Sequence, residues 1–156
     1  MTETLLPTNH LNLTDTAFLA NTGPVRILKT NRSLAKFIFL GIVTLGIYPI
    51  VVMYESTESL NLIAQRDGRK TMNYLLTVLL LTPITAGIYS MIWSHGIANR
   101  IGDESSRRGF GRMVSASDFW IWNILGTLII VGPFIYLHKF LKAMNSISAS
   151  YNQVGA

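Results

Sequence analysis

Three long stretches of the chain carry no formally charged residue. They cover residues 37–54, 71–94 and 119–137, and they are 18, 24 and 19 residues long. An α-helix rises about 1.5 Å per residue and the hydrocarbon core of a bilayer is about 30 Å thick, so each stretch predicts a helix that spans or nearly spans a membrane. The alternative is a soluble bundle in which the same three helices are buried.

Aromatic residues mark the ends of these stretches. Trp93 closes the second stretch, and Trp120 and Trp122 open the third. The other three ends carry Tyr54, Tyr74 and Tyr136. Amphipathic rings favour the headgroup depth of a bilayer, so this placement favours the membrane interpretation over the soluble bundle.

The composition agrees with a membrane location. Hydrophobic residues make up 49% of the chain and charged residues 13%, and the mean hydropathy is +0.37. A soluble domain has about 25% charged residues. The net charge of +5 permits either nucleic acid or an anionic membrane as a partner, and the apolar stretches favour the membrane. The absence of cysteine excludes disulfides, thiolate metal sites and cysteine nucleophiles.

Residues 1–31 differ from the rest and predict a mostly irregular N-terminal tail, with a short ordered piece at 25–28. They contain no basic start followed by an apolar run, so no cleaved secretory signal is expected. Residues 32–153 are expected to form a single membrane domain.

The positions of Lys and Arg predict an orientation. Three crossings would place eight of them, in the tail and the second loop, on one side and five on the other. Because cytoplasmic segments carry the excess of positive charge, the N-terminus is expected in the cytoplasm and the C-terminus outside. Basic flanks on every stretch also suit a protein that never crosses fully.

A five-residue motif recurs in the first two stretches. Thr-Leu-Gly-Ile-Tyr at 44–48 and Thr-Ala-Gly-Ile-Tyr at 85–89 lie 41 residues apart and share four of five residues. A degraded copy at 130–134 keeps a glycine and an aromatic residue. The motif predicts three repeats, at about 32–70, 71–112 and 115–153.

The Arg-flanked apolar run that ends in this motif resembles a known family, the domain-of-unknown-function family 4234 of small bacterial membrane proteins. The resemblance covers residues 32 to 110, from Arg32 and Ser33 through the first motif to the second copy between Thr85 and Trp93. The third repeat departs from the pattern. The resemblance implies an integral bacterial membrane protein and implies no reaction.

The motif has the composition of a helix break. Glycine costs about 1 kcal/mol relative to alanine inside a helix, and a threonine hydroxyl can bond back to the preceding turn. Prolines lie close to all three copies, at Pro49, Pro83 and Pro133. The sequence therefore predicts an all-α fold of three transmembrane helix repeats with amphipathic polar extensions. The repeats are kinked at breaks formed by Thr44, Gly46, Tyr48, Thr85, Gly87, Tyr89 and Gly132. A structural kink is favoured over a ligand site built from the freed backbone.

Two helix faces are predicted to pack. Apolar residues between Leu137 and Tyr151 recur at helical spacing and form one face of an amphipathic helix, which suits the membrane surface or the other repeats. A stripe of small residues at intervals of four allows close helix packing within the protein or with a neighbour, although chance spacing is the alternative. The stripe consists of Ala86, Ser90, Ser94 and Ala98.

No catalytic chemistry is expected. The charge-free stretches contain no ionisable acid or base of the kind that proton relays need. In the second loop, His95, the acids Asp103 and Glu104, and Ser105 match no known spacing of a metal site or nucleophile. His10 and His138 lie elsewhere, so no three-histidine site is predicted, and no metal or cofactor is expected.

Three arginines, Arg107, Arg108 and Arg112, surround Phe110 in the second loop. Each would gain about 1 kcal/mol beside anionic lipid headgroups, with the phenyl ring dipping into the interface. A nucleic-acid site would need more positive charge and stacking residues on one face, so nucleic acid is not an expected partner. Lipid headgroup contact is the prediction for these arginines.

The sequence as a whole predicts a non-enzymatic integral protein of a bacterial cytoplasmic membrane. It would act as a structural or regulatory interaction partner, through self-association or through another membrane protein. An oligomeric pore or transport component is the first alternative, and a membrane enzyme is the second.

Overall fold

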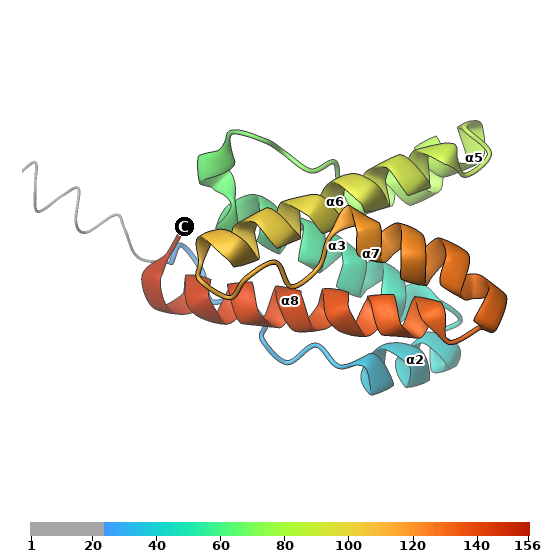
Figure 1. The fold of residues 1–156 in the computed structure, drawn as a ribbon, viewed down its shortest axis with the longest axis horizontal. Coiled ribbons are helices and arrows are strands. Elements are labelled where there is room, and N and C mark those ends of the chain that lie inside the picture. The colour runs from blue at the N-terminus through green and yellow to red at the C-terminus, as the bar shows by residue number, and fades with distance from the viewer. Residues whose placement is uncertain (1–23) are drawn as a thin grey trace, which may run out of the picture.

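The computed structural model describes residues 24–156, and every regular element within them is helical. The chain forms three consecutive helical hairpins, each with an incoming arm, a tight turn and a longer outgoing arm (Figure 1). The predicted all-α class is confirmed. Residues 1–23, which make up most of the predicted N-terminal tail, lie outside the described residues.

The first hairpin consists of α2 (Leu34–Val43) and α3 (Ile47–Ile63), and the 3₁₀ turn η1 (Gln65–Asp67) follows it. Gly68 ends η1 in the left-handed conformation, with φ of 66°. This conformation suits glycine because a Cβ atom would be strained there.

The incoming arm of the second hairpin is built from short consecutive pieces. These are α4 (Tyr74–Leu76), the π-helical η2 (Thr77–Leu81) and α5 (Thr82–Ile84). Asn73 caps the arm by accepting a hydrogen bond from the Leu75 amide. The outgoing arm is α6 (Ile88–Arg107).

The third hairpin has the same plan. Its incoming arm combines α7 (Ala116–Asp118), the π-helical η3 (Phe119–Ile124) and the 3₁₀ helix η4 (Leu125–Ile129). A capping box between Ser115 and Asp118 starts this arm. The outgoing arm is α8 (Gly132–Val154).

The long arms α3, α6 and α8 supply most of the core. Leu60 and Ile63 of α3, Ile97 and Ile101 of α6, and Met144 of α8 are almost fully buried. The apolar face predicted between Leu137 and Tyr151 packs into this core, with Phe140, Leu141, Ile147 and Tyr151 also buried. The helix α8 therefore docks against the other repeats.

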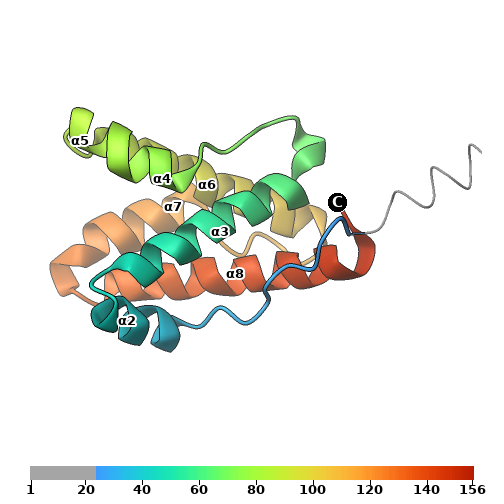
Figure 2. The same ribbon diagram turned by 180° about the vertical axis from the view of Figure 1, so that it is seen from behind.

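The N-terminal segment before α2 lies against α8. The amide of Val25 donates to the Tyr151 hydroxyl at 3.0 Å. The Leu28 amide donates to Asn152 Oδ1, and the Leu28 carbonyl accepts from Asn152 Nδ2. Both ends of the described chain therefore lie at the same end of the molecule, which both ribbon views show (Figures 1 and 2).

The charge-free stretches fold back on themselves, which corrects the expectation of three crossing helices. Each stretch turns near its middle, at 44–46, 85–87 and 130–131, and the hydrogen bond between Val25 and Tyr151 is incompatible with placing these two residues on opposite sides of a membrane. Among residues 24–156, no helix combines the length and the apolar character that crossing a bilayer requires.

Candidate membrane interface

The three hairpin turns lie at one end of the molecule, opposite the chain ends (Figures 1 and 2). Many exposed large apolar side chains belong to these hairpins, among them Leu45 at 93% exposure, Leu128 at 86% and Ile130 at 75%, whereas Val25 and Ile27, at 76% and 75%, lie in the segment before α2. Others in the same hairpins are Phe39, Ile42, Val43, Ile47, Leu79, Ile84, Ile88, Ile92, Leu125, Ile129 and Val131. An apolar surface of this kind is typical of an interaction site, because monomers in water rarely expose one.

The two copies of the five-residue motif form the same turn. Thr44 ends α2 and Gly46 precedes α3 with φ of 91°, while Thr85 ends α5 and Gly87 precedes α6 with φ of 90°. The residue before each glycine, Leu45 or Ala86, also has positive φ, near 50°. Two successive left-handed residues reverse the chain, so the feature is a hairpin turn and not a kink.

The threonine of each motif joins the two arms of its hairpin. The Thr44 hydroxyl donates to the Leu40 carbonyl at 2.6 Å and accepts from the Tyr48 amide at 2.9 Å. Thr85 repeats both bonds with Leu81 and Tyr89, at 2.7 and 3.0 Å. The side chain therefore closes the end of one helix and caps the start of the next.

Four consecutive amides of each turn have partners within the same hairpin, the fourth being the Tyr48 or Tyr89 amide that pairs with the threonine hydroxyl. In the first copy the amides of Leu45, Gly46 and Ile47 donate to the carbonyls of Ile42, Gly41 and Thr44, at 2.8 to 3.2 Å. The second copy repeats this pattern at Ala86, Gly87 and Ile88, at 2.8 to 3.3 Å. A turn whose amides need no water is compatible with hydrocarbon, where unpaired backbone groups are costly.

The third turn is built differently. Its positive φ, 60°, falls on Ile130 and not on Gly132, which is the first residue of α8. A Cβ atom on Gly132 would lie 2.4 Å from the Gly126 Cα and 2.3 Å from the Trp122 carbonyl oxygen. Gly132 therefore serves close contact between the two arms, in place of the helix break predicted for it.

We expect Gly87→Ala, and equally Gly46→Ala, to lower the free energy of unfolding by about 1–2 kcal/mol, because a side chain resists the left-handed conformation. A Cβ atom on either glycine would meet nothing within 4 Å, so the cost is conformational alone. Gly96→Ala is the matched control, because Gly96 also has open space but lies inside α6. The control is expected to stabilise by about 0.5–1 kcal/mol in thermal unfolding. Equal effects at Gly87 and Gly96 would contradict the turn geometry.

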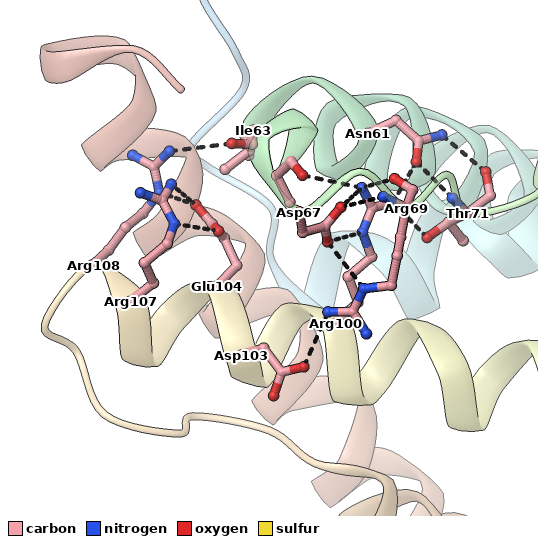
Figure 3. Close-up of polar contacts among 11 residues, drawn as sticks. Asn61, Ile63, Asp67, Arg69, Thr71, Arg100, Asp103, Glu104, Arg107 and Arg108 are labelled. Atoms are coloured by element: carbon pink, nitrogen blue, oxygen red, sulfur yellow. Dashed lines mark hydrogen bonds and ion pairs between the residues drawn. The ribbon is translucent and has the colours of Figure 1, made fainter.

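The C-terminal half of α6, which lies toward the end opposite the hairpin turns (Figure 1), carries a network of charged side chains whose contacts Figure 3 shows. The Arg100 guanidinium, only 4% exposed, donates from Nε to Asp67 Oδ2 at 2.8 Å and also to Thr71 Oγ1 at 2.8 Å. It further bonds Asn61 Oδ1 and the carbonyls of Ala64 and Arg69. These contacts tie α6 to η1 and to the loop before α4. Burial alone would raise the pKa of the Asp67 carboxyl, but the Arg100 and Arg69 contacts outweigh burial and lower it.

The arginines predicted to meet lipid headgroups have protein partners at this end. Arg107 and Arg108 both bond Glu104, which is 5% exposed, and the Arg108 side chain is itself 4% exposed. Arg112 pairs with Asp103 at 3.0 Å. The Arg108 guanidinium therefore neutralises a buried carboxylate, while lipid contact by Arg107 and Arg112, both more than 40% exposed, stays a prediction.

Residues 32–103 match the model of a family described as a domain of unknown function, DUF4234. This segment of the chain is similar to the DUF4234 family. The match covers the first hairpin and most of the second, with both copies of the motif, and the third hairpin lies outside it. No curated protein and no solved structure matches the chain.

The predicted stripe of small residues is only partly helical. Ala86 lies in the turn with φ of 49°, while Ser90 and Ser94 of α6 are half-buried and Ala98 is fully buried. Ser90 donates back to the Gly87 carbonyl at 2.6 Å. The structure therefore places Ala98 in the core, and packing by the two serines stays a prediction.

The polar residues considered for catalysis have separate partners. His95 contacts Trp120 and Asn99, whereas Asp103 pairs with Arg69 and Arg112. Ser105 is buried and donates to the Gly102 carbonyl at 2.9 Å. Across residues 24–156, no three His, Asp or Glu side chains gather as metal ligands would.

Proposed function

We propose that this protein is a non-enzymatic integral protein of a bacterial cytoplasmic membrane, inserted from one side by its three hairpins. The turns end within the bilayer and the charged end remains at the membrane surface. The protein serves there as a structural or regulatory interaction partner. The observation that carries this proposal is the gathering of three charge-free, apolar hairpin turns at one end.

The lengths of the arms support insertion into one leaflet. The charge-free part of the incoming arm has nine residues in the first hairpin, from 37 to 45, and twelve in the third, from 119 to 130. As helix these lengths correspond to about 13–18 Å, against about 15 Å for half of the hydrocarbon core. A stretch that is long enough to cross the bilayer when straight reaches its midplane when folded in two.

The charge distribution supports a cytoplasmic location for the exposed end. All 13 Lys and Arg residues lie outside the three charge-free stretches. Positively charged segments are retained on the cytoplasmic side. Three crossings would leave five of the Lys and Arg residues on the other side, whereas three hairpins keep all 13 on the cytoplasmic side. Both chain ends and both loops are therefore proposed to face the cytoplasm.

Cysteine labelling tests this topology, because the chain has no native cysteine. We expect Gln65→Cys and Ser106→Cys, both at exposed positions, to react with a membrane-impermeant maleimide from the cytoplasmic side only. Three crossings would place these two loops on opposite sides. Inverted vesicles and intact spheroplasts give the two sides of the measurement.

Leu128→Cys is the internal control, because Leu128 is 86% exposed on the protein and should be shielded only by lipid. It should resist the reagent from both sides until detergent is added. Labelling of Leu128→Cys in sealed membranes, or release of the protein by alkaline carbonate, would overturn the proposal.

A further inference from the structure

A cleft of about 660 Å³ lies between the two arms of the first hairpin. Its apolar lining comes from Phe39 and Leu40 of α2 and from Tyr48, Val51 and Val52 of α3. These residues lie toward the hairpin turn, and Lys29, Arg32 and Lys36 line the cleft toward the opposite end. The cleft therefore has a cationic end and an apolar end, aligned with the axis of the hairpin.

The cationic end has unused positive charge. Lys29 pairs with Glu55 at 2.6 Å, and Glu55 is the one acid that lines the cleft among the described residues. Lys36 and Arg32 have no carboxylate within ion-pair distance in residues 24–156. Two cations therefore remain to attract an anion.

Arg32 has incompletely satisfied donors as well as charge. Two of its outer contacts, to Ser148 Oγ and Ser59 Oγ, are long at 3.4 Å, and its third is to the Lys29 carbonyl. Its Nε is buried and has no hydrogen-bond partner. Burial lowers the pKa of this guanidinium, and the charge of Glu55 opposes the shift only partly. A partly buried arginine without a paired carboxylate gains from an anionic ligand.

The start of α2 adds positive potential at the same end. Ser33, the residue before the helix, makes no capping hydrogen bond with its side chain. The first amides of this ten-residue helix therefore lack a side-chain partner. Ala35 and Lys36, in the same first turn, line the cleft.

We propose that this cleft binds one anionic phospholipid, with the phosphate beside Arg32 and Lys36 and an acyl chain along Phe39, Leu40 and Val51. Only the orientation of the bound lipid depends on the membrane topology proposed above. In that topology the acyl chain points toward the hairpin turn, as the chain of a lipid in the same leaflet would. Binding itself is a property of the cleft and is measured without a bilayer.

The test uses the purified full chain in a neutral detergent, titrated with dioctanoyl phosphatidylglycerol, dioctanoyl phosphatidylcholine or inorganic phosphate. Thermal unfolding and native mass spectrometry report binding. We expect phosphatidylglycerol to bind in a one-to-one ratio and to raise the melting temperature, with little effect from the other two probes. Equal binding of the two lipids, or full occupancy by inorganic phosphate, would overturn the proposal.

Two variants separate the ends of the cleft. Lys36→Gln should weaken phosphatidylglycerol binding about 5-fold, the effect of one cation near an anionic headgroup, whereas Lys142→Gln on exposed α8 surface should not. Val51→Trp should weaken it about 10-fold by displacing about two methylene groups from the apolar end. Its control is Ile121→Trp, which adds the same side chain at an exposed position of η3. Unchanged binding in both Lys36→Gln and Val51→Trp would contradict the site.

The two proposals fail separately. Lys36→Gln and Val51→Trp should float with neutral phosphatidylcholine vesicles as the wild type does, because the three hairpin turns are intact. Loss of flotation in the wild type would reject membrane insertion and leave the detergent titration as the measure of the cleft. Normal flotation with no lipid selectivity would reject the cleft alone.

Discussion

Asp67→Asn is expected to lower the free energy of unfolding by about 3 kcal/mol, because it leaves a buried arginine without its counter-charge. The Arg100 side chain is 4% exposed, and Asp67 receives hydrogen bonds from two of its nitrogens, at 2.8 and 3.1 Å. The remaining contacts to Asn61, Thr71 and backbone carbonyls are neutral acceptors. Denaturation in detergent, followed by tryptophan fluorescence, gives the measurement.

The same pair predicts how stability depends on pH. The pKa of Asp67 is lower in the folded protein than in the unfolded chain, so its stabilising contribution is complete above the ordinary carboxyl value of about 3.9. As the pH falls below that value, the unfolded chain takes up the proton first and the contribution is lost. The difference in stability between wild type and Asp67→Asn should therefore shrink below about pH 4.

Asp103→Asn is the matched control for both measurements. Asp103 pairs with Arg69 at 3.3 Å and with Arg112 at 3.0 Å, but it is 43% exposed. Exposed pairs contribute about 1 kcal/mol or less. If Asp103→Asn and Asp67→Asn cost the same, the buried network would not be what holds η1 and the following loop to α6.

The charge pattern alone located the three hairpins but did not show that each stretch folds in two. A charge-free run has the same composition whether its helix is straight or reversed at the middle. In the first two hairpins the reversal depends on two successive positive φ values, one of them at Leu45 or Ala86, and on the bonds of Thr44 and Thr85. Leucine and alanine give no local signal for a left-handed conformation.

The aromatic residues at the ends of the charge-free stretches differ in whether they face the core or the surface of the protein. Trp93 is buried against Tyr74, with ring centroids 5.1 Å apart, and donates to the Met72 carbonyl at 2.8 Å. Tyr136 is also in the core, so both rings pack against protein, and headgroup depth stays a prediction for these two residues. Trp120, at 42% exposure, remains available to an interface. An aromatic residue at the end of an apolar stretch can lie in the protein core or at a membrane interface, and its position in the sequence does not distinguish the two.

Part of the ion-pair network could have been predicted. Glu104 lies three and four residues before Arg107 and Arg108, a spacing at which opposite charges meet on a helix. Asp67 and Arg100 lie 33 residues apart on different elements, so only the tertiary fold brings them together. The ion pairs within α6 could therefore be predicted from the sequence, whereas the ion pair between η1 and α6 could not.

The close contact in the third hairpin predicts a large effect of a single added methyl group. Gly132→Ala is expected to cost about 3 kcal/mol, because overpacking a contact that cannot relax forces the backbone to move. The added Cβ would meet Trp122 and Gly126 backbone atoms at 2.3 to 2.5 Å, and backbone has no rotamer that could yield. Gly126→Ala should follow it with a smaller loss, since its nearest neighbour is the Gly132 Cα at 2.8 Å.

The comparison with Gly87→Ala separates two uses of glycine in this chain. Gly87 has space for a Cβ atom, but its left-handed backbone conformation is unfavourable for any residue with a side chain. Gly132 lies at the start of α8 without positive φ and has no space for a Cβ atom. Thermal unfolding should therefore rank Gly132→Ala as the most damaging change, Gly87→Ala as intermediate and Gly96→Ala as stabilising. A harmless Gly132→Ala would mean that η3 and η4 do not press against α8, and the third hairpin would then be a looser unit than the two that carry the intact motif.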